Sequence, residues 1–347
     1  MTNFTPSSPA RILIVTDAWF PQVNGVVRTF STVVDHLQHL GHTIRLITPD
    51  QFKTVPCPTY PSIRLAVLPG RRVASIIREF KPHAIHIATE GPLGFAARNF
   101  CVHHHLPFTT SYATKFPEYT YARIRLPLSA GYAAMRWFHK PSRAVMVATP
   151  SLERELRSRG FTNLVPWTRG VDTNLFKPRD KSFLTAPRPI LLYVGRVAIE
   201  KNIEAFLNLP FPGSKFVVGD GPQLPALAQK YPHVHFVGMK HGEELAHYYA
   251  AADVLVFPSL TDTFGLVMLE ALASGVPVAA FPVTGPLDVI GNSGVGVLHH
   301  NLATAVQQAL SIAPHRCREF ALQFSWQRVA ELFLHNLAFF SPTPNLL

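Results

Sequence analysis

Short runs of β-branched and other apolar residues alternate with helical stretches along this chain, and the rhythm occurs twice. In the first half the runs cover residues 12–16, 44–48, 63–66, 84–88, 108–112 and 145–149. In the second half they cover residues 190–194, 215–218, 235–237, 254–257, 276–281 and 296–298. Strands that alternate with helices form parallel sheets. The sequence therefore predicts an α/β protein with two doubly wound, Rossmann-like domains that face each other across a cleft.

The rhythm weakens at residues 177–189, where charged residues, serine and prolines cluster as in a linker. We therefore expect an N-terminal domain over residues 1–176 and a C-terminal domain over residues 177–325. Residues 326–347 begin with an amphipathic segment that predicts a terminal helix, which can pack back toward the N-terminal domain. Parallel α/β sheets bind ligands at the carboxyl ends of their strands, so we expect a ligand in the cleft.

The length and composition also limit the class of protein. A chain of 347 residues with 47% hydrophobic residues can bury two cores. Cys57, Cys101 and Cys317 are too far apart for the spacing of a zinc site or a disulfide framework. We expect no signal peptide, because Arg11 is followed by only a short apolar run at residues 12–15, and no apolar run approaches the roughly 18 residues of a membrane-spanning helix. We expect a cytoplasmic protein whose membrane contact is at most peripheral, on the inner face.

The net charge of +11 is confined to one half of the chain. Residues 1–170 hold 20 Lys/Arg and 8 Asp/Glu, whereas residues 171–347 hold 12 and 13. A basic domain attracts anionic partners such as lipid head groups, nucleic acids or acidic saccharides. Residues 119–140 are both aromatic and basic, which suits contact with an anionic membrane; the alternative is a core-packed helix with a solvated basic face. Because no nucleic-acid-binding motif is present, we expect no nucleic-acid partner.

The strongest local motif covers residues 258–278, which lead from an apolar strand into a helix. The amides of Phe264, Gly265 and Leu266 can point from a helix N-terminus toward an anion, as in a phosphate site. Asp262 and Glu270 are about two helical turns apart, so their carboxylates can accept hydrogen bonds from hydroxyls at different parts of one elongated ligand. The alternative is structural, with Asp262 as a helix cap and Glu270 as a solvated helix residue.

Two further motifs supply groups that suit phosphate. Arg196 follows the strand at residues 190–194, and Lys201 lies about one turn into the expected next helix, so both cations can stabilise a departing diphosphate. They can instead be surface charges that are paired with Glu200 or Glu204. Asn24-Gly25 after the first strand allows a left-handed turn and close approach of backbone to phosphate at Gly25. The three histidines at residues 103–105 point in different directions, so we expect no metal site.

Together with residues 169–178 and 219–222, these motifs resemble glycosyltransferase family 4 over nearly the whole chain. The resemblance implies the two-domain GT-B fold. Segments 17–28, 89–94, 110–119 and 282–286 are similar to the GDP-mannose-dependent α-mannosyltransferases of this family, which act on glycolipids or glycans. The resemblance therefore implies a nucleotide diphosphate sugar donor, with GDP-mannose as the first candidate and a UDP-sugar as the alternative, and a lipid-linked or glycan acceptor.

The resemblance also implies roles for individual residues. Gly25 lines the diphosphate site, Arg196 and Lys201 bind the pyrophosphate, Asp262 contacts donor-sugar hydroxyls and Glu270 holds the ribose. Many relatives carry glutamate at the position of Asp262, and the shorter side chain changes its reach toward the sugar. Such enzymes retain the anomeric configuration without a metal or other cofactor, through front-face attack in which a donor phosphate oxygen helps to take the acceptor proton.

One position departs from the family pattern. Ala113 stands where the family usually has a histidine that reaches toward the donor sugar, and alanine cannot donate that hydrogen bond. Loss of such a group typically costs about 100-fold in rate. A catalytically impaired nucleotide-sugar-binding protein is therefore one rival to the enzyme. A nucleic-acid-binding protein and a sugar-nucleotide epimerase are the others.

Overall fold

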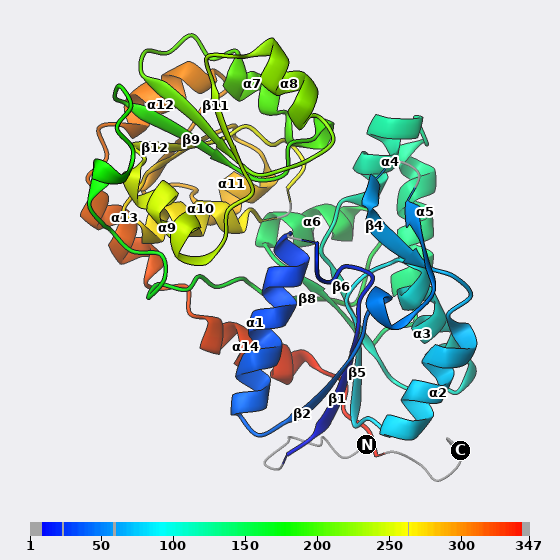
Figure 1. Ribbon diagram of the computed structural model, residues 1–347. Helices are drawn as coiled ribbons and strands as arrows, with labels where there is room; N and C mark the ends of the chain where they lie inside the picture. The colour runs from blue at the N-terminus through cyan, green and yellow to red at the C-terminus, as the bar shows by residue number, and fades with distance from the viewer. Residues whose placement is uncertain (1–8, 23, 58–59, 263, 342–347) are drawn as a thin grey trace. The chain divides into compact units, whose positions relative to one another are not determined.

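The computed structural model describes residues 9–22, 24–57, 60–262 and 264–341. Its contacts divide the chain into two compact units. Unit 1 consists of Met1–Thr168 with Trp326–Leu347, and unit 2 consists of Arg169–Ser325. Both are α/β units, and Figure 1 shows their elements in chain order by colour. None of the helices formed by the described residues is both long enough and apolar enough to span a bilayer.

The described part of unit 1 contains a six-stranded parallel sheet in the order β2-β1-β5-β6-β7-β8. In that order the strands span Thr43–Ile47, Arg11–Val15, Ala84–Ile87, Thr109–Tyr112, Ala144–Val147 and Leu164–Pro166. Side chains of β1 alternate between the two faces. Leu13 and Val15 pack with α2 (Gly70–Phe80) and α3 (Pro92–His103), whereas Ile12 and Ile14 pack with α1 (Gly25–His39) and α14 (Trp326–Asn336). The sheet is thus covered on both faces, as predicted.

One expected strand belongs elsewhere. Residues 63–66 lie in β4 (Tyr60–Ala66), which pairs antiparallel with β3 (Thr54–Cys57) instead of joining the parallel sheet. The interpretation was wrong because an apolar run indicates a strand but not its partner. The sixth position of the sheet is taken by β8, a three-residue strand that the periodicity did not indicate. The described residues of the unit also form α4 (Phe116–Ile124), α5 (Leu128–His139) and α6 (Pro150–Ser158).

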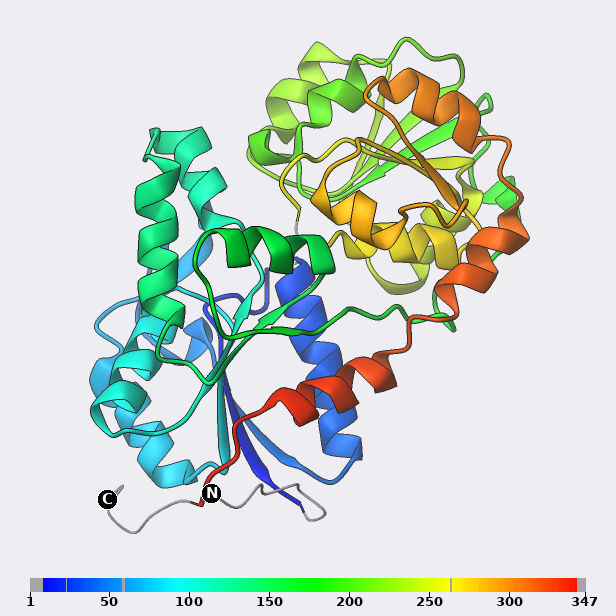
Figure 2. The same cartoon turned by 180° about the vertical axis from the view of Figure 1, so that it is seen from behind.

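The described part of unit 2 contains a second parallel sheet, in the order β11-β10-β9-β12-β13-β14. In that order its strands span His235–Gly238, Ser214–Val218, Ile190–Val194, Val254–Phe257, Val278–Ala280 and Gly296–Leu298. One face packs against α7 (Ile203–Leu207), α8 (Leu224–Lys230) and α12 (Leu302–Ala309) in a single apolar cluster. The other helices of the described residues are α9 (Gly242–Ala251), α10 (Leu266–Ala273), α11 (Thr284–Val289) and α13 (Pro314–Ala321). Figure 2 shows the same structure from behind. These two sheets establish the expected pair of Rossmann-like units.

The boundary between the units falls at Thr168 and Arg169, eight residues before the expected one. The segment after Thr168 is held by the end of unit 2. The Val171 N–H donates to the Phe324 carbonyl at 3.1 Å, and the Arg318 guanidinium donates to the carbonyls of Thr173 and Phe176 at 2.8 and 2.7 Å. Composition marked the polar stretch at residues 177–189, but its Lys181 and Arg188 pair with Asp253 at 2.8 and 2.7 Å, and the stretch belongs to unit 2.

The terminal helix α14 packs inside unit 1, alongside α1, as both views show (Figures 1 and 2). The Trp167 indole N–H donates to the Val329 carbonyl at 3.1 Å. The ring of Phe333 packs against Phe30 and Trp167 with centroids 6.1 and 5.1 Å apart. Residues from both ends of the chain therefore form one core in unit 1.

Candidate functional site

The strand order of the unit 2 sheet reverses between β9 and β12, and sheets of this kind bind ligands beyond the carboxyl ends of the strands at such a switch point. Lys201 lies on the loop after β9, at the end of the short 3-10 helix η3 (Ile199–Lys201). Asp262 lies on the loop after β12. The Lys201 ammonium and the Asp262 Oδ1 form an ion pair, with side chains 20% and 17% exposed. The structure therefore brings these two predicted residues into direct contact at the switch point.

The second oxygen of Asp262 lacks a partner. Among the described side chains, Asp262 Oδ2 is a buried oxygen without a hydrogen bond. A buried acceptor that is left unsatisfied costs about 1–3 kcal/mol, so such atoms in native proteins call for an explanation. A ligand hydroxyl that reached this oxygen would satisfy it.

Two hydrogen bonds from side chains to backbone carbonyls connect the two loops. The Asn202 side-chain amide donates to the Pro258 carbonyl at 3.1 Å, and the Thr261 hydroxyl donates to the Glu200 carbonyl at 3.2 Å. Lys201 was expected in the first turn of a helix, but α7 begins only at Ile203, after Asn202 with its left-handed φ of 51°. The lysine is therefore held by a turn, and the loop pairing fixes it opposite Asp262.

Arg196 lies on the same β9–α7 loop, half-buried, and its carbonyl accepts the Tyr193 hydroxyl at 2.7 Å. Close backbone packing shapes this loop. A Cβ on Gly219 would lie 1.9 Å from the Gly195 carbonyl oxygen, and one on Gly221 would lie 2.3 Å from the Val197 carbonyl oxygen. The glycines after β10 thus let the β9 and β10 loops touch, which keeps Arg196 at the edge where Lys201 and Asp262 lie.

The N-terminus of α10 lies just beyond Asp262. Gly265 is its N-cap residue, with a left-handed φ of 87° and without a side-chain cap among the described residues. Phe264 is buried, and Leu266 begins the helix. The structural alternative for Asp262 is therefore wrong, because Asp262 pairs with Lys201 instead of capping α10. Anion binding at this helix N-terminus stays a prediction.

Glu270 is a buried residue of α10, only 4% exposed, so the alternative that it is solvated is also wrong. Its Oε2 accepts the Tyr249 hydroxyl of α9 at 2.7 Å. Tyr249 was not predicted, because nothing in local spacing connects it to a residue 21 positions later. A surface pair of Lys201 with Glu204 is also wrong, because Glu204 pairs with Lys230 at 2.6 Å and Lys201 pairs with Asp262.

Gly25 is the first residue of α1 in unit 1. Asn24 caps this helix, and its side-chain oxygen accepts the N–H groups of Val26 and Val27 at 3.0 Å each. The expected left-handed turn at Asn24-Gly25 is wrong, since Asn24 has an extended φ of −154°. A capped helix N-terminus replaces it. Ala113 directly follows β6 and is partly buried.

The aromatic and basic segment at residues 119–140 forms α4 and α5, and its residues divide between core and surface. Tyr132 and Phe138 are buried, as the core alternative requires. Ile124 and Trp137 are 65% and 53% exposed. Neither interpretation alone describes this segment, because it packs through one face and leaves large apolar side chains on the other.

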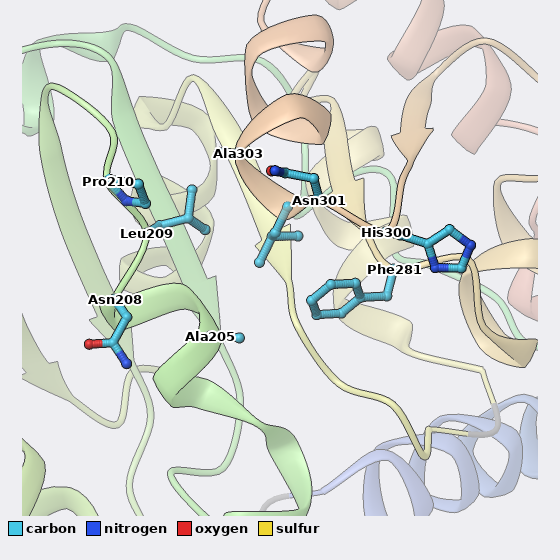
Figure 3. A pocket seen from close by; sticks show the side chains of 9 residues that line it. Ala205, Asn208, Leu209, Pro210, Phe281, His300, Asn301 and Ala303 are labelled. Carbon is cyan, nitrogen blue, oxygen red and sulfur yellow. The ribbon is translucent and has the colours of Figure 1, made fainter.

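A separate pocket of about 330 Å³ lies in unit 2 between α7 and α12 (Figure 3). Leu209 and Phe281 reach into it from opposite sides, and Asn208 and Asn301 contribute polar groups. Among the described residues that line it there is no predicted donor residue. This pocket is therefore distinct from the Lys201–Asp262 pair.

Comparisons with known proteins agree with this architecture. The model described as Glycosyltransferase Family 4 matches residues 23–175, and the one described as Glycosyl transferases group 1 matches residues 188–312. A GDP-mannose-dependent α-mannosyltransferase of Mycobacterium tuberculosis is 30% identical over 346 residues, which cover 90% of this chain and 90% of the relative. Sulfoquinovosyl transferase SQD2 of Arabidopsis thaliana is 31% identical over 82% of this chain, which spans only 62% of that relative.

A solved structure extends the agreement to the fold. The sucrose-phosphate synthase of Thermosynechococcus elongatus superimposes with a TM-score of 0.75 at 22% identity, over 93% of this chain and 97% of the other. The two Rossmann-like sheets agree with this fold, and so does the loop pair at the switch point of unit 2. The matched relatives cover most of the chain. The chain therefore belongs to glycosyltransferase family 4 and has the GT-B fold.

Proposed function

We propose that this glycosyltransferase moves a hexose from a nucleotide diphosphate donor to a glycolipid or glycan acceptor with retention of the anomeric configuration. The observation that carries the proposal is the Lys201–Asp262 pair with its unsatisfied Asp262 Oδ2. A cation beside an acceptor oxygen at the switch point suits a ligand that presents a phosphate next to a hydroxyl.

In this proposal the donor phosphates replace Asp262 as partner of Lys201, and Arg196 binds the same diphosphate. Asp262 then accepts donor-sugar hydroxyls, and Glu270 accepts ribose hydroxyls while Tyr249 keeps its carboxylate in place. The amides at Phe264, Gly265 and Leu266 and the helix N-terminus at Gly25 add donors to the phosphates. Lys201, Arg196 and these backbone N–H groups stabilise the negative charge that develops on the leaving group.

The proposed reaction breaks the bond between the anomeric carbon and the diphosphate oxygen and forms one from the anomeric carbon to the acceptor oxygen on the same face. The proton of the acceptor hydroxyl passes to a departing phosphate oxygen. Neither a protein nucleophile nor a metal takes part in this step. Lys201 and Arg196 are the chain's own contribution, because their charges lower the cost of separating the diphosphate.

GDP-mannose is the donor that we propose first, because the mycobacterial relative is named for it. A UDP-sugar is the alternative. A thermal-shift screen of GDP-mannose, GDP-glucose, UDP-glucose and the free nucleotides would decide, since selective binding raises the unfolding temperature by mass action. Preferred stabilisation by GDP-mannose, followed by NMR of the product anomer in a transfer assay, would support the proposal. Equal responses to all donors would contradict the choice of GDP-mannose, and an inverted product would contradict retention.

A catalytically impaired donor-binding protein is the second candidate, and Ala113 is the observation that favours it. Alanine at the end of β6 supplies no hydrogen bond to a donor sugar. Donor binding without transfer or donor hydrolysis across a panel of lipid and glycan acceptors would favour this candidate over the enzyme.

For the acceptor we propose a lipid-linked sugar at an anionic membrane on the cytoplasmic side. The exposed Ile124 and Trp137 lie in the unit that carries the excess positive charge of the chain, and Arg125 lies next to Ile124. Apolar side chains among cations suit an interface with anionic head groups. Co-sedimentation with vesicles of phosphatidylglycerol and of phosphatidylcholine would test this contact.

A further inference from the structure

A buried aspartate lies at the switch point of the unit 1 sheet and has no part in the function proposed above. The strand order of that sheet reverses between β1 and β5. Asp17 follows β1 by two residues, and Thr89 follows β5 by two residues. Both residues are buried, at 7% and 8% exposure. Asp17 and Thr89 are therefore neighbours at the carboxyl ends of β1 and β5.

Asp17 is fully engaged with the loop after β5 and with the start of α3. Its Oδ1 accepts the Leu93 N–H at 2.8 Å, and its Oδ2 accepts the Gly94 N–H at 3.2 Å and the Thr89 hydroxyl at 2.9 Å. Its own N–H donates to the Thr89 hydroxyl oxygen at 2.7 Å. One carboxylate thus joins the loop after β1 to the first turn of α3.

The fit around this carboxylate is close. A Cβ at Gly91 would lie 2.3 Å from the Asp17 Cγ, and a Cβ at Gly94 would lie 2.0 Å from the Thr89 carbonyl oxygen. Both glycines leave the space that lets the aspartate reach the helix amides. The contact is therefore built by the loops on both sides of the switch point.

The loop that Asp17 anchors leads to the N-terminus of α1. Thr16 and Ala18 form a turn through the Thr16 hydroxyl at 2.9 Å, and the Gln22 N–H donates to the Trp19 carbonyl at 3.1 Å. Asn24 then caps α1, and Gly25 begins it. Asp17 and Gly25 therefore belong to the same connection between β1 and α1.

We propose that Asp17 is a positioning residue, which holds the start of the β1–α1 connection, residues 17–22, against α3 so that the N-terminus of α1 at Gly25 meets the donor diphosphate. The role rests on the proposed function, because it requires a diphosphate at Gly25. Asp17 itself touches neither donor nor acceptor.

Stability alone does not account for an aspartate here. Burial raises the pKa of Asp17 to about 6, even though the Leu93, Gly94 and Thr89 hydrogen bonds act in the opposite direction. The ionised carboxylate is therefore costly in this place, and a neutral residue of the same shape would avoid the cost. A charged group that holds two backbone N–H groups at once fixes the loop more tightly than an amide, which accepts through one atom only.

The test compares Asp17→Asn, Thr89→Val and the control Asp35→Asn, which places the same substitution on an exposed residue of α1. Titration calorimetry with GDP-mannose, and with UDP-glucose if the wild-type protein prefers it, gives the donor Kd. We expect Asp17→Asn to raise the Kd about tenfold, Thr89→Val to raise it less, and Asp35→Asn to leave it unchanged. Urea unfolding at pH 7.5 should show no loss of stability in Asp17→Asn, since relief of the buried charge offsets the lost hydrogen bond.

Hydrogen exchange separates this role from the proposed function. Faster exchange of the Val26 and Val27 amides in Asp17→Asn would support the relay from Asp17 to α1, whereas exchange that rises only at Leu93 and Gly94 would overturn it. A donor Kd for Asp17→Asn within twofold of wild type would overturn it as well. If the wild-type protein binds neither donor, the proposed function falls, and the positioning role for a donor falls with it.

Discussion

Lys201 and Asp262 form an ion pair across the point at which the strand order of the unit 2 sheet reverses. The two residues are 61 positions apart in the chain and are brought together because β9 and β12 are neighbours in the sheet. Asp17 and Thr89 bridge the equivalent point of the unit 1 sheet. In each unit a carboxylate therefore holds together the two loops that a ligand of such a fold would contact.

Substitution of Lys201 by alanine tests the unit 2 pair. Lys201→Ala removes a cation from the proposed diphosphate site and leaves the half-buried Asp262 without its ion-pair partner. We expect kcat/KM for the donor to fall about 100-fold or more, and stability to fall by about 1–3 kcal/mol. Lys230→Ala is the control, because Lys230 pairs with Glu204 on the surface, where an ion pair contributes about 0–1 kcal/mol. Equal kcat/KM for Lys201→Ala and Lys230→Ala would contradict the assignment.

Histidine at position 113 should restore the hydrogen bond that the family pattern implies. We expect Ala113→His to raise kcat severalfold or more while the donor Kd changes little, because the added group acts on the developing charge near the scissile bond. Ala113→Ser, which adds a shorter polar group, serves as the control for added polarity. Turnover that stays unchanged with an identified acceptor would exclude this role for position 113.

The pKa of Asp17 leads to a prediction about stability. Burial raises it from 3.8 to about 6, so between these values the folded protein holds a proton that the unfolded chain has released. The contribution to stability is therefore fully present below pH 3.8 and is lost as the pH rises through 6. Between pH 5 and 7.5 the wild-type protein should lose about 1–2 kcal/mol relative to Asp17→Asn. Urea unfolding of both proteins at the two pH values measures the difference, and a difference independent of pH would contradict the raised pKa.

Gly91 tests how closely Asp17 fits. Gly91 has an extended φ of −90°, so alanine can adopt its backbone conformation, but the added Cβ would lie 2.3 Å from the Asp17 Cγ. We expect Gly91→Ala to cost about 1–3 kcal/mol of stability through overpacking. Gly70→Ala is the matched control, because the same methyl group at the first residue of α2 meets no atom within 4 Å. Similar unfolding midpoints for the two variants would show that the loops around Asp17 shift to accept the methyl group without a loss of stability.

The sequence predicted the two sheets because their strands are apolar, short and separated by helical segments, and β9, β12 and β14 have the expected bounds. Periodicity could not identify the partner of residues 63–66, since a strand has the same pattern in a hairpin and in a parallel sheet. It placed Asp262 in the loop after an apolar strand, where parallel sheets bind ligands, but it placed Lys201 in a helix that begins only at Ile203. Asp17 and Tyr249 have roles that depend on partners far along the chain, and local spacing in the sequence does not predict those contacts.

The exposed apolar residues of α4 and α5 lead to a prediction about membranes. Ile124 and Trp137 are large apolar side chains on the surface of the basic unit. If they enter an interface, Ile124→Ser and Trp137→Ser should each weaken binding to phosphatidylglycerol vesicles about tenfold, since burial of such a side chain contributes about 1.5–3 kcal/mol. Leu322→Ser is the control, because Leu322 is a similarly exposed apolar residue of unit 2. Salt should weaken the residual binding, because head-group attraction is screened over about 8 Å at physiological ionic strength. Equal vesicle binding by all three variants would place the contact elsewhere on the protein.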